Sequence, residues 1–220
     1  MHPIALLGLG LLLGLRHAAD PDHVVAVTAI AARTHRVRPA LWLGAVWGIG
    51  HTLTLFTVGA AIILFNWVVP PRLGLAMEFA VALALVVVGL LNLGRPPRRD
   101  DELGARAGGP LALRAFVVGL VHGLAGSAAV ALLVLATVRD PRWACAWLLV
   151  FGAGTFGGMA LVTTGFAVPV ATVARQWGGA GRVIRLATGT MSLAFGLWLA
   201  YQVGWHDGLF GSVAPRWTPH

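Results

Sequence analysis

The chain has no lysine, a single cysteine and few charged residues of either sign. All 16 basic residues are arginine, only 8 residues are acidic, and charged residues make up 11% of the 220 positions. A soluble domain of this size has about 25% charged residues. With Cys145 as the lone thiol, an internal disulfide and a relay between two thiols are both excluded. The scarcity of charge therefore argues against a soluble domain.

The chain is instead rich in apolar residues. They make up 58% of the chain, the mean hydropathy is +0.81, and they occur in blocks of about 20 or more, enough to cross a ~30 Å hydrocarbon layer. We therefore predict an all-α integral membrane protein with about six transmembrane helices and an uncleaved first span. The expected spans are residues 4–32, 39–69, 75–93, 115–138, 144–172 and 186–204.

The arginines predict how these spans are oriented. Most of them lie in three alternate connections: Arg33, Arg36 and Arg38; Arg95, Arg98, Arg99, Arg106 and Arg114; Arg175, Arg182 and Arg185. Short loops rich in arginine stay in the cytoplasm, so both termini are expected outside a multi-pass protein of the cell (inner) membrane. A pI near 11.7 alone would suggest a nucleic-acid partner. We instead expect these arginines to meet lipid headgroups, and no nucleic acid.

The two halves of the chain resemble each other. Residues 14–18 match 119–123, residues 46–50 match 150–154, and residues 89–90 match 196–197, at offsets of 104 to 107 positions. Three spans per repeat place the second half upside down, as in inverted-repeat transporters. We expect a first repeat over 1–93, a cytoplasmic linker over 94–113, a second repeat over 114–204 and a tail over 205–220. Convergent packing of small residues between helices is the alternative.

Two histidines, two aspartates and an arginine interrupt the first apolar span, in the order Arg16, His17, Asp20, Asp22 and His23. Each charge at the centre of a bilayer costs about 2.5–3.5 kcal/mol on insertion scales, so such a cluster requires partners or water. A proline following Asp20 disfavours helical geometry there and removes a backbone donor. We expect the first helix to break near Pro21, so that these side chains converge. The alternative places this stretch at the membrane interface.

Two further histidines lie in apolar surroundings. His51 follows Gly48 and Gly50 in the second span, and is either a ligand or relay, or a packing residue. His122 occupies the position in the second half that matches His17, and is a pathway ligand, a proton carrier or a structural hydrogen-bonding group. Thr155 replaces His51 in the second half, so the two halves are expected to be functionally unequal.

The pattern His17-x4-Asp22-His23 resembles the signature of the nickel/cobalt transporter family, and Gly50-His51-Thr52 resembles that family's next motif. Residues 119–128 are more similar to the UreH-type urease-accessory membrane proteins. Nothing here matches the acidic motif, Gly-Phe-Asp-Thr-Ala-Thr-Glu, in the second half of the longer permeases, which favours a shorter, accessory-type relative. The resemblance implies nickel or cobalt as cargo, no organic cofactor, and urease or hydrogenase metal-delivery proteins as partners.

These observations predict a carrier of a divalent transition-metal ion rather than an enzyme. Imidazole and carboxylate ligands by themselves also suit zinc or iron. His17, Asp22 and His23 are expected to bind the ion, Asp20 either ligates it or orients an imidazole, and His51 completes the site or passes the ion on. Two other functions stay open: an exporter of small anions or amino acids with Arg16 as its anion site, and an electron-transfer protein with a bis-histidine haem.

Overall fold

The structure is a computed structural model of the whole chain. It describes residues 3–34, 36–65, 69–94, 109–123, 138, 140–177, 179–211, 215 and 217. Within these residues every regular element is a helix, as the sequence predicts. The elements are α1 (Pro3–His17), α2 (Pro21–Ala31), α3 (Val37–Phe65), α4 (Pro71–Gly94), α6 (Pro110–His122), α8 (Pro141–Gln176), α9 (Ala180–Tyr201) and the π-helical turn η1 (Gln202–His206).

Within the described residues, four helical segments are long and apolar enough to cross a membrane: α3, α4, α8 up to Ala174, and α9 together with η1. The pair formed by α1 and α2 has the same character when taken together, but its axis bends by 54° at the break between them. With this pair the number of candidate spans is five. The shorter α6 is also apolar, and most of the rest of the expected span over 115–138 lies outside the described residues.

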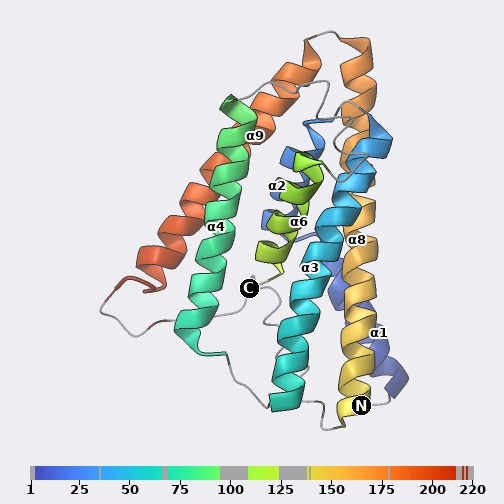
Figure 1. Cartoon of the computed structure of the whole chain (residues 1–220), viewed down its shortest axis with the longest axis vertical. Helices are drawn as coiled ribbons and strands as arrows, with labels where there is room; N and C mark the ends of the chain where they lie inside the picture. The colour runs from blue at the N-terminus through green and yellow to red at the C-terminus, as the bar shows by residue number, and fades with distance from the viewer. Residues whose placement is uncertain are drawn as a thin grey trace.

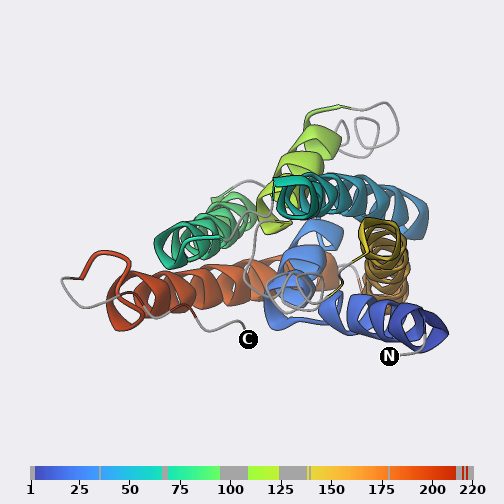
Figure 2. The same cartoon turned by 90° about the horizontal axis from the view of Figure 1, so that it is seen from below.

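The helices pack in pairs around α2 (Figures 1 and 2). Helix α4 packs extensively against α9, α1 against α8, and α3 against both α6 and α8. The short α2 contacts α3, α4, α8 and α9, so it lies in the middle of the bundle. Its residues from Val25 to Ala31 are all buried, and they form the main apolar core with Leu43 and Trp47 of α3 and with Val81 and Leu85 of α4.

Glycines allow two of these helix pairs to approach closely. A Cβ atom at position 14 in α1 would overlap the backbone of Phe151 in α8, and one at position 119 in α6 would overlap the backbone of Trp47 in α3. Small residues at such contacts are typical of membrane helix packing, which lacks a hydrophobic driving force between helices. Large apolar side chains such as Leu64, Leu161 and Leu197 point outward and are exposed, as expected of surfaces that face lipid.

The helix ends lie close to the expected span ends, with two differences in the loops. The linker expected over 94–113 is shorter at its end, because Pro110 already begins α6. Proline suits the first turn of a helix, where its missing N–H has no partner to lose. The tail expected from residue 205 begins inside η1, which ends at His206. The predicted linker otherwise falls on residues 95–108, outside the described part.

Candidate metal site

The site is built on the turn between α1 and α2. α1 ends at His17, and Ala18, Ala19 and Asp20 form the turn before Pro21 begins α2. Asp20 adopts extended geometry (φ −61°, ψ 145°), the conformation that a following proline favours. The turn therefore brings the last residue of α1 close to the first turn of α2, where Asp22 and His23 lie.

His17 is held from both sides of its ring. Its Nδ1 donates to Asp20 Oδ2 at 3.1 Å, and its Nε2 lies 3.0 Å from Nε2 of His51 in α3. The ring is 4% exposed and also lies against Phe151 of α8, with centroids 5.6 Å apart. The carboxylate thus fixes the proton on Nδ1 and directs the Nε2 lone pair toward α3.

His23 repeats this arrangement with its neighbour. Its Nδ1 donates to Asp22 Oδ1 at 2.9 Å, and the ring is fully buried. Its Nε2 is also buried and has no hydrogen-bond partner among the described residues. A buried nitrogen without a partner is costly, and a carboxylate on the opposite ring nitrogen is the usual support of a metal-ligating imidazole.

His51 completes a group of three imidazoles. It stands at the middle of α3 (Val37–Phe65), its ring centroid is 5.0 Å from that of His23, and its Nδ1 is buried without a partner in the described part of the chain. One ring nitrogen of each of His17, His23 and His51 lies within 4.8 Å of the others. A second group, Asp20, Asp22 and His23, meets the same limit and shares His23 with the first.

His122, at the end of α6, lies beside this group. Its ring centroid is 5.8 Å from that of His23, and its Nδ1 donates to the carbonyl oxygen of Val118 at 2.9 Å. Its Nε2 is buried without a partner among the described residues. The six candidate ligands that the sequence indicated therefore gather in one region.

Sequence reasoning missed Trp47. This fully buried indole lies one turn before His51 on α3, and its ring contacts those of His23, His51 and His122 at centroid distances of 5.4 to 5.9 Å. The spacing of four residues between Trp47 and His51 places both on one helix face. Trp47 forms an apolar wall of the site, a role that the i,i+4 spacing by itself would have suggested.

A cavity of about 400 Å³ adjoins the site on its carboxylate side. Asp20 and Asp22 line it, together with Glu78 of α4 and Asp207 after η1. The sequence analysis had not included Glu78 and Asp207 among the site residues, because only the fold brings α4 and η1 to the start of α2. Arg16, by contrast, is exposed and lies outside the set of residues that line this cavity.

Comparisons with known proteins also indicate metal-ion transport. The family model described as "High-affinity nickel-transport protein" matches residues 4–94, which hold five of the six candidate residues. The chain is also 34% identical, over 219 residues, to the urease accessory protein UreH of Bacillus sp. (strain TB-90), covering 94% of this chain and 95% of that protein. No solved structure matches the chain.

Proposed function

Since the chain belongs to the nickel/cobalt transporter superfamily, among the UreH-type urease-accessory membrane proteins, we propose that it carries nickel or cobalt ions across the cell membrane through buried histidine and half-buried aspartate side chains. Membership of this family indicates that the chain is a membrane protein that transports metal ions. The choice of ion and the residues that bind it are our inference, and we expect no catalytic reaction and no organic cofactor.

One observation carries this proposal: three buried imidazoles, from α1, α2 and α3, place a ring nitrogen within 4.8 Å of one another. Neutral imidazole is a preferred ligand of nickel, copper, zinc and iron, and the match to a nickel-transport family supports our choice of nickel among them. Asp20 and Asp22 bond to the Nδ1 atoms of His17 and His23, so both Nε2 atoms face away from the carboxylates, and that of His17 is bonded to His51.

Charge supports the same assignment. A divalent ion in the hydrocarbon layer is very costly unless anionic groups surround it. His51 lies at the middle of a long apolar helix, so an ion held beside it would be deep in the membrane. Two aspartates within the cluster partly neutralise such an ion. His122, with its Nε2 unpartnered among the described residues, is placed to receive the ion as a further ligand.

The helix pairs support an inverted repeat. α1 packs on α8 as α6 packs on α3, and α4 packs on α9. The positions agree with the sequence offsets: a Cβ at Gly89 would lie 2.6 Å from the nitrogen of Leu193, and one at Gly196 would lie 2.8 Å from the nitrogen of Val86. Gly89 and Leu193 thus exchange roles with Gly196 and Val86. We infer two three-helix repeats, 1–93 and 114–204, with the bent α1–α2 pair as the first span.

The repeat also supports the predicted orientation. The ends of α2, α4 and α8 lie at the end of the bundle opposite to the N-terminus (Figure 1), and the arginine-rich connections follow these helix ends. We propose that this end faces the cytoplasm and that both termini lie outside. A urease or hydrogenase metal-delivery protein would then receive the ion on the arginine-rich side.

The two rival functions fit the site less well. A bis-histidine haem needs two nitrogens about 4 Å apart across its iron, given metal–nitrogen bonds of about 2.0–2.1 Å, whereas His17 and His51 approach to 3.0 Å. An anion carrier that used Arg16 would need this side chain inside the protein, and it is exposed.

Uptake of radioactive nickel tests the proposal. Cells expressing the protein are compared with cells expressing equal amounts of the His17→Ala, Asp22→Ala, His23→Ala triple variant, and with empty cells. Arg16→Ala is the matched control, because Arg16 precedes His17 but points away from the site. We expect the intact protein and the Arg16→Ala variant to change nickel accumulation equally, and the triple variant to match empty cells.

The direction of the change is itself informative. Accumulation above that of empty cells indicates import, and accumulation below it indicates export. If the intact protein matches empty cells for nickel, and then for cobalt and zinc, the metal-carrier proposal is wrong. The anion exporter predicts a different result. Transport of its anionic substrate would be lost in the Arg16→Ala variant and retained in the triple variant.

A further inference from the structure

Two cavities of very different size lie at opposite ends of α2. The cavity of about 400 Å³ meets its first turn at Asp20, Pro21 and Asp22. A cavity of only about 30 Å³ meets its other end at Ile30 and Arg33. The metal-site residue His23 lies close to the large cavity, and about 10 Å of helix separates it from Ile30, at 1.5 Å per residue.

The two cavities occupy related places in the two halves of the chain. Val88, Leu91 and Asn92 of α4 line the small cavity. Phe195, Trp198 and Leu199 of α9 line the large one. Each residue of the first set differs from its counterpart in the second by the offset that relates Gly89 to Gly196. The cavity beside α9 is therefore open, whereas the corresponding cavity beside α4 is nearly closed.

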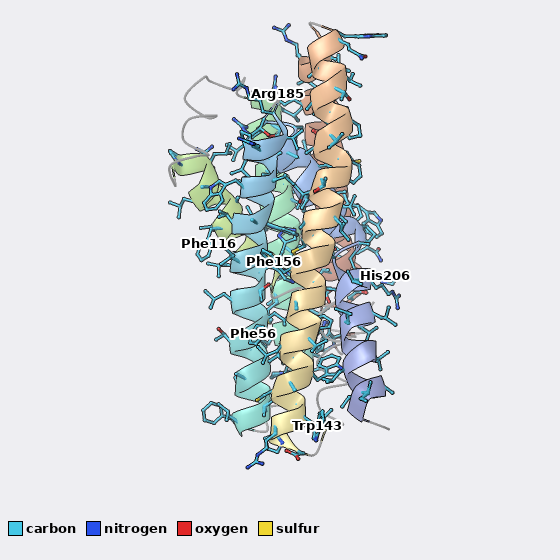
Figure 3. All side chains as sticks on the ribbon, turned by 90° about the vertical axis from the view of Figure 1, so that its right-hand side faces the viewer. Phe56, Phe116, Trp143, Phe156, Arg185 and His206 are labelled. Carbon is cyan, nitrogen blue, oxygen red and sulfur yellow. The ribbon has the colours of Figure 1, made fainter. Side chains whose placement is uncertain are left out.

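A hydrogen-bond network closes the small cavity. The fully buried side chain of Asn92 donates through Nδ2 to Ala29 O of α2 at 2.6 Å, and its Oδ1 accepts from Arg33 Nη1 at 3.2 Å. Arg33 Nη1 also donates to Leu91 O at 3.0 Å. Arg185 of α9 donates to the carbonyl oxygen of Asn92. The network joins α2, α4 and α9 at the end of the bundle where Arg185 lies, opposite to Trp143 (Figure 3).

The chemistry at this end of α4 favours two arginines. The last carbonyl groups of a helix lack intrahelical donors and carry the negative end of the helix dipole, and α4 ends at Gly94, just after Leu91 and Asn92. At the related place beside the large cavity, Leu199 stands where Asn92 stands here. An apolar side chain cannot form the same bonds, so Leu199 cannot close the large cavity in the way that Asn92 closes the small one.

We propose that Asn92, with Arg33 and Arg185, is the gate on the arginine-rich side of the carrier, and that the structure has this gate closed and the carboxylate side open. Opening requires the bonds from Asn92 to Ala29 and Arg33 to break, which lets the small cavity widen while the large one narrows. This inference rests on the proposed function, because only a carrier needs alternating access to a central site. The ion would pass Asp20 and Asp22 on one side of the central site and Asn92 on the other.

Cysteine labelling measures the two cavities separately. In a Cys145→Ser background, Val88→Cys reports on the small cavity and Phe195→Cys, its counterpart, on the large one. A membrane-impermeant maleimide is applied to purified protein in lipid nanodiscs, which expose both faces. We expect rapid labelling of the Phe195→Cys variant and slow labelling of the Val88→Cys variant.

The gate is then weakened by Asn92→Leu, which copies the residue of the other half. We expect labelling of Val88→Cys to rise about tenfold, the effect of about 1.4 kcal/mol on an equilibrium, and labelling of Phe195→Cys to fall. Arg33→Gln keeps Asn92 in place and should shift labelling the same way, so a poorly folded Asn92→Leu variant does not end the test. Ser192→Ala is the matched control: it removes a buried bond of 2.8 Å from α9 to Leu85 O, away from the gate.

Unchanged labelling of Val88→Cys in both gate variants would overturn the proposal. So would a rise at both reporters, or an equal rise in the Ser192→Ala control, since each indicates general loosening rather than a gate. The labelling requires no nickel, so its outcome is separate from that of the uptake experiment. Uptake that depends on His17, together with unchanged labelling, would preserve the carrier and remove the gate.

Discussion

The Nε2 atoms of His17 and His51 lie 3.0 Å apart, at the contact of α1 with α3. Asp20 holds the other nitrogen of His17, so the facing Nε2 presents a lone pair. Two nitrogens bound to one ion at about 2.0–2.1 Å, at right angles, would be about 2.9 Å apart. In this structure the two nitrogens share a hydrogen bond, for which His51 supplies the proton. We expect Ni²⁺ to displace that proton, because the same spacing suits neighbouring ligands in an octahedral or square-planar geometry.

If both imidazoles bind the same ion, their losses are not additive. We expect His17→Ala and His51→Ala each to weaken nickel binding by more than about 100-fold, because loss of an outer partner of a ligand alone costs about 10–100-fold. The double variant should lose little beyond the worse single variant. Isothermal titration calorimetry on purified protein in detergent measures the three affinities. Additive losses would indicate that the two histidines belong to separate sites.

The sequence predicts that Asp22 binds the ion directly, but in the structure Asp20 and Asp22 each hold an imidazole. We therefore expect removal of either charge to have a smaller effect than loss of a histidine. We expect Asp20→Asn and Asp22→Asn each to weaken nickel binding by about 10–100-fold. Asp140→Asn is a matched control, because that carboxylate is exposed, lies outside the candidate site and accepts from the Arg142 backbone nitrogen at the start of α8. The same calorimetry applies. A loss from Asp22→Asn as large as that from His23→Ala would instead make Asp22 a direct ligand.

The sequence predicted the helices and the six clustered residues for local reasons. Apolar blocks of sufficient length predict spans, and a proline after Asp20 predicts extended geometry at that residue, which the structure has. The stretch from Arg16 to His23 was identified because charged groups within a membrane span are costly unless they have partners or water. Arg16 itself is exposed, since it lies on the outer face of α1, a distinction that composition does not make.

Contacts between distant segments were beyond local reasoning. Glu78 and Asp207 reach the same cavity as Asp20 only because α4, η1 and α2 meet there. Asn92 lies among apolar residues on α4, and nothing near it in sequence indicates that it bonds to Ala29 and Arg33. Such partners depend on how helices rotate and cross, and that is decided by packing over the whole bundle.

The glycines at helix contacts should tolerate no side chain. We expect Gly14→Ala and Gly119→Ala each to lower the free energy of unfolding by about 1–3 kcal/mol, the usual cost of overpacking a filled interior. Each Cβ would overlap a backbone carbonyl, that of Phe151 or that of Trp47. Gly8→Ala is the control on the same helix as Gly14, because nothing lies within 4 Å of that position. Thermal unfolding in detergent compares the variants, and equal midpoints for Gly8→Ala and Gly14→Ala would contradict the packing of α1 on α8.

The carboxylates of the large cavity should attract a cation before it reaches the imidazoles. Removing one charge at about 4 Å in water costs about 1 kcal/mol, which is about a fivefold change in apparent affinity. We therefore expect Glu78→Gln to raise the KM for nickel transport up to about fivefold at low ionic strength, with little change in maximal rate, and the difference to shrink at high salt. The amide keeps an oxygen that can accept from Trp217 Nε1, as Glu78 Oε1 does at 2.8 Å. Asp207→Asn should act in the same direction, whereas Asp140→Asn, which alters an exposed carboxylate outside the cavity lining, should leave KM unchanged. Initial transport rates at several nickel concentrations and two salt concentrations measure these effects on KM and maximal rate. If KM changes neither with the substitutions nor with salt, ions do not enter through this cavity.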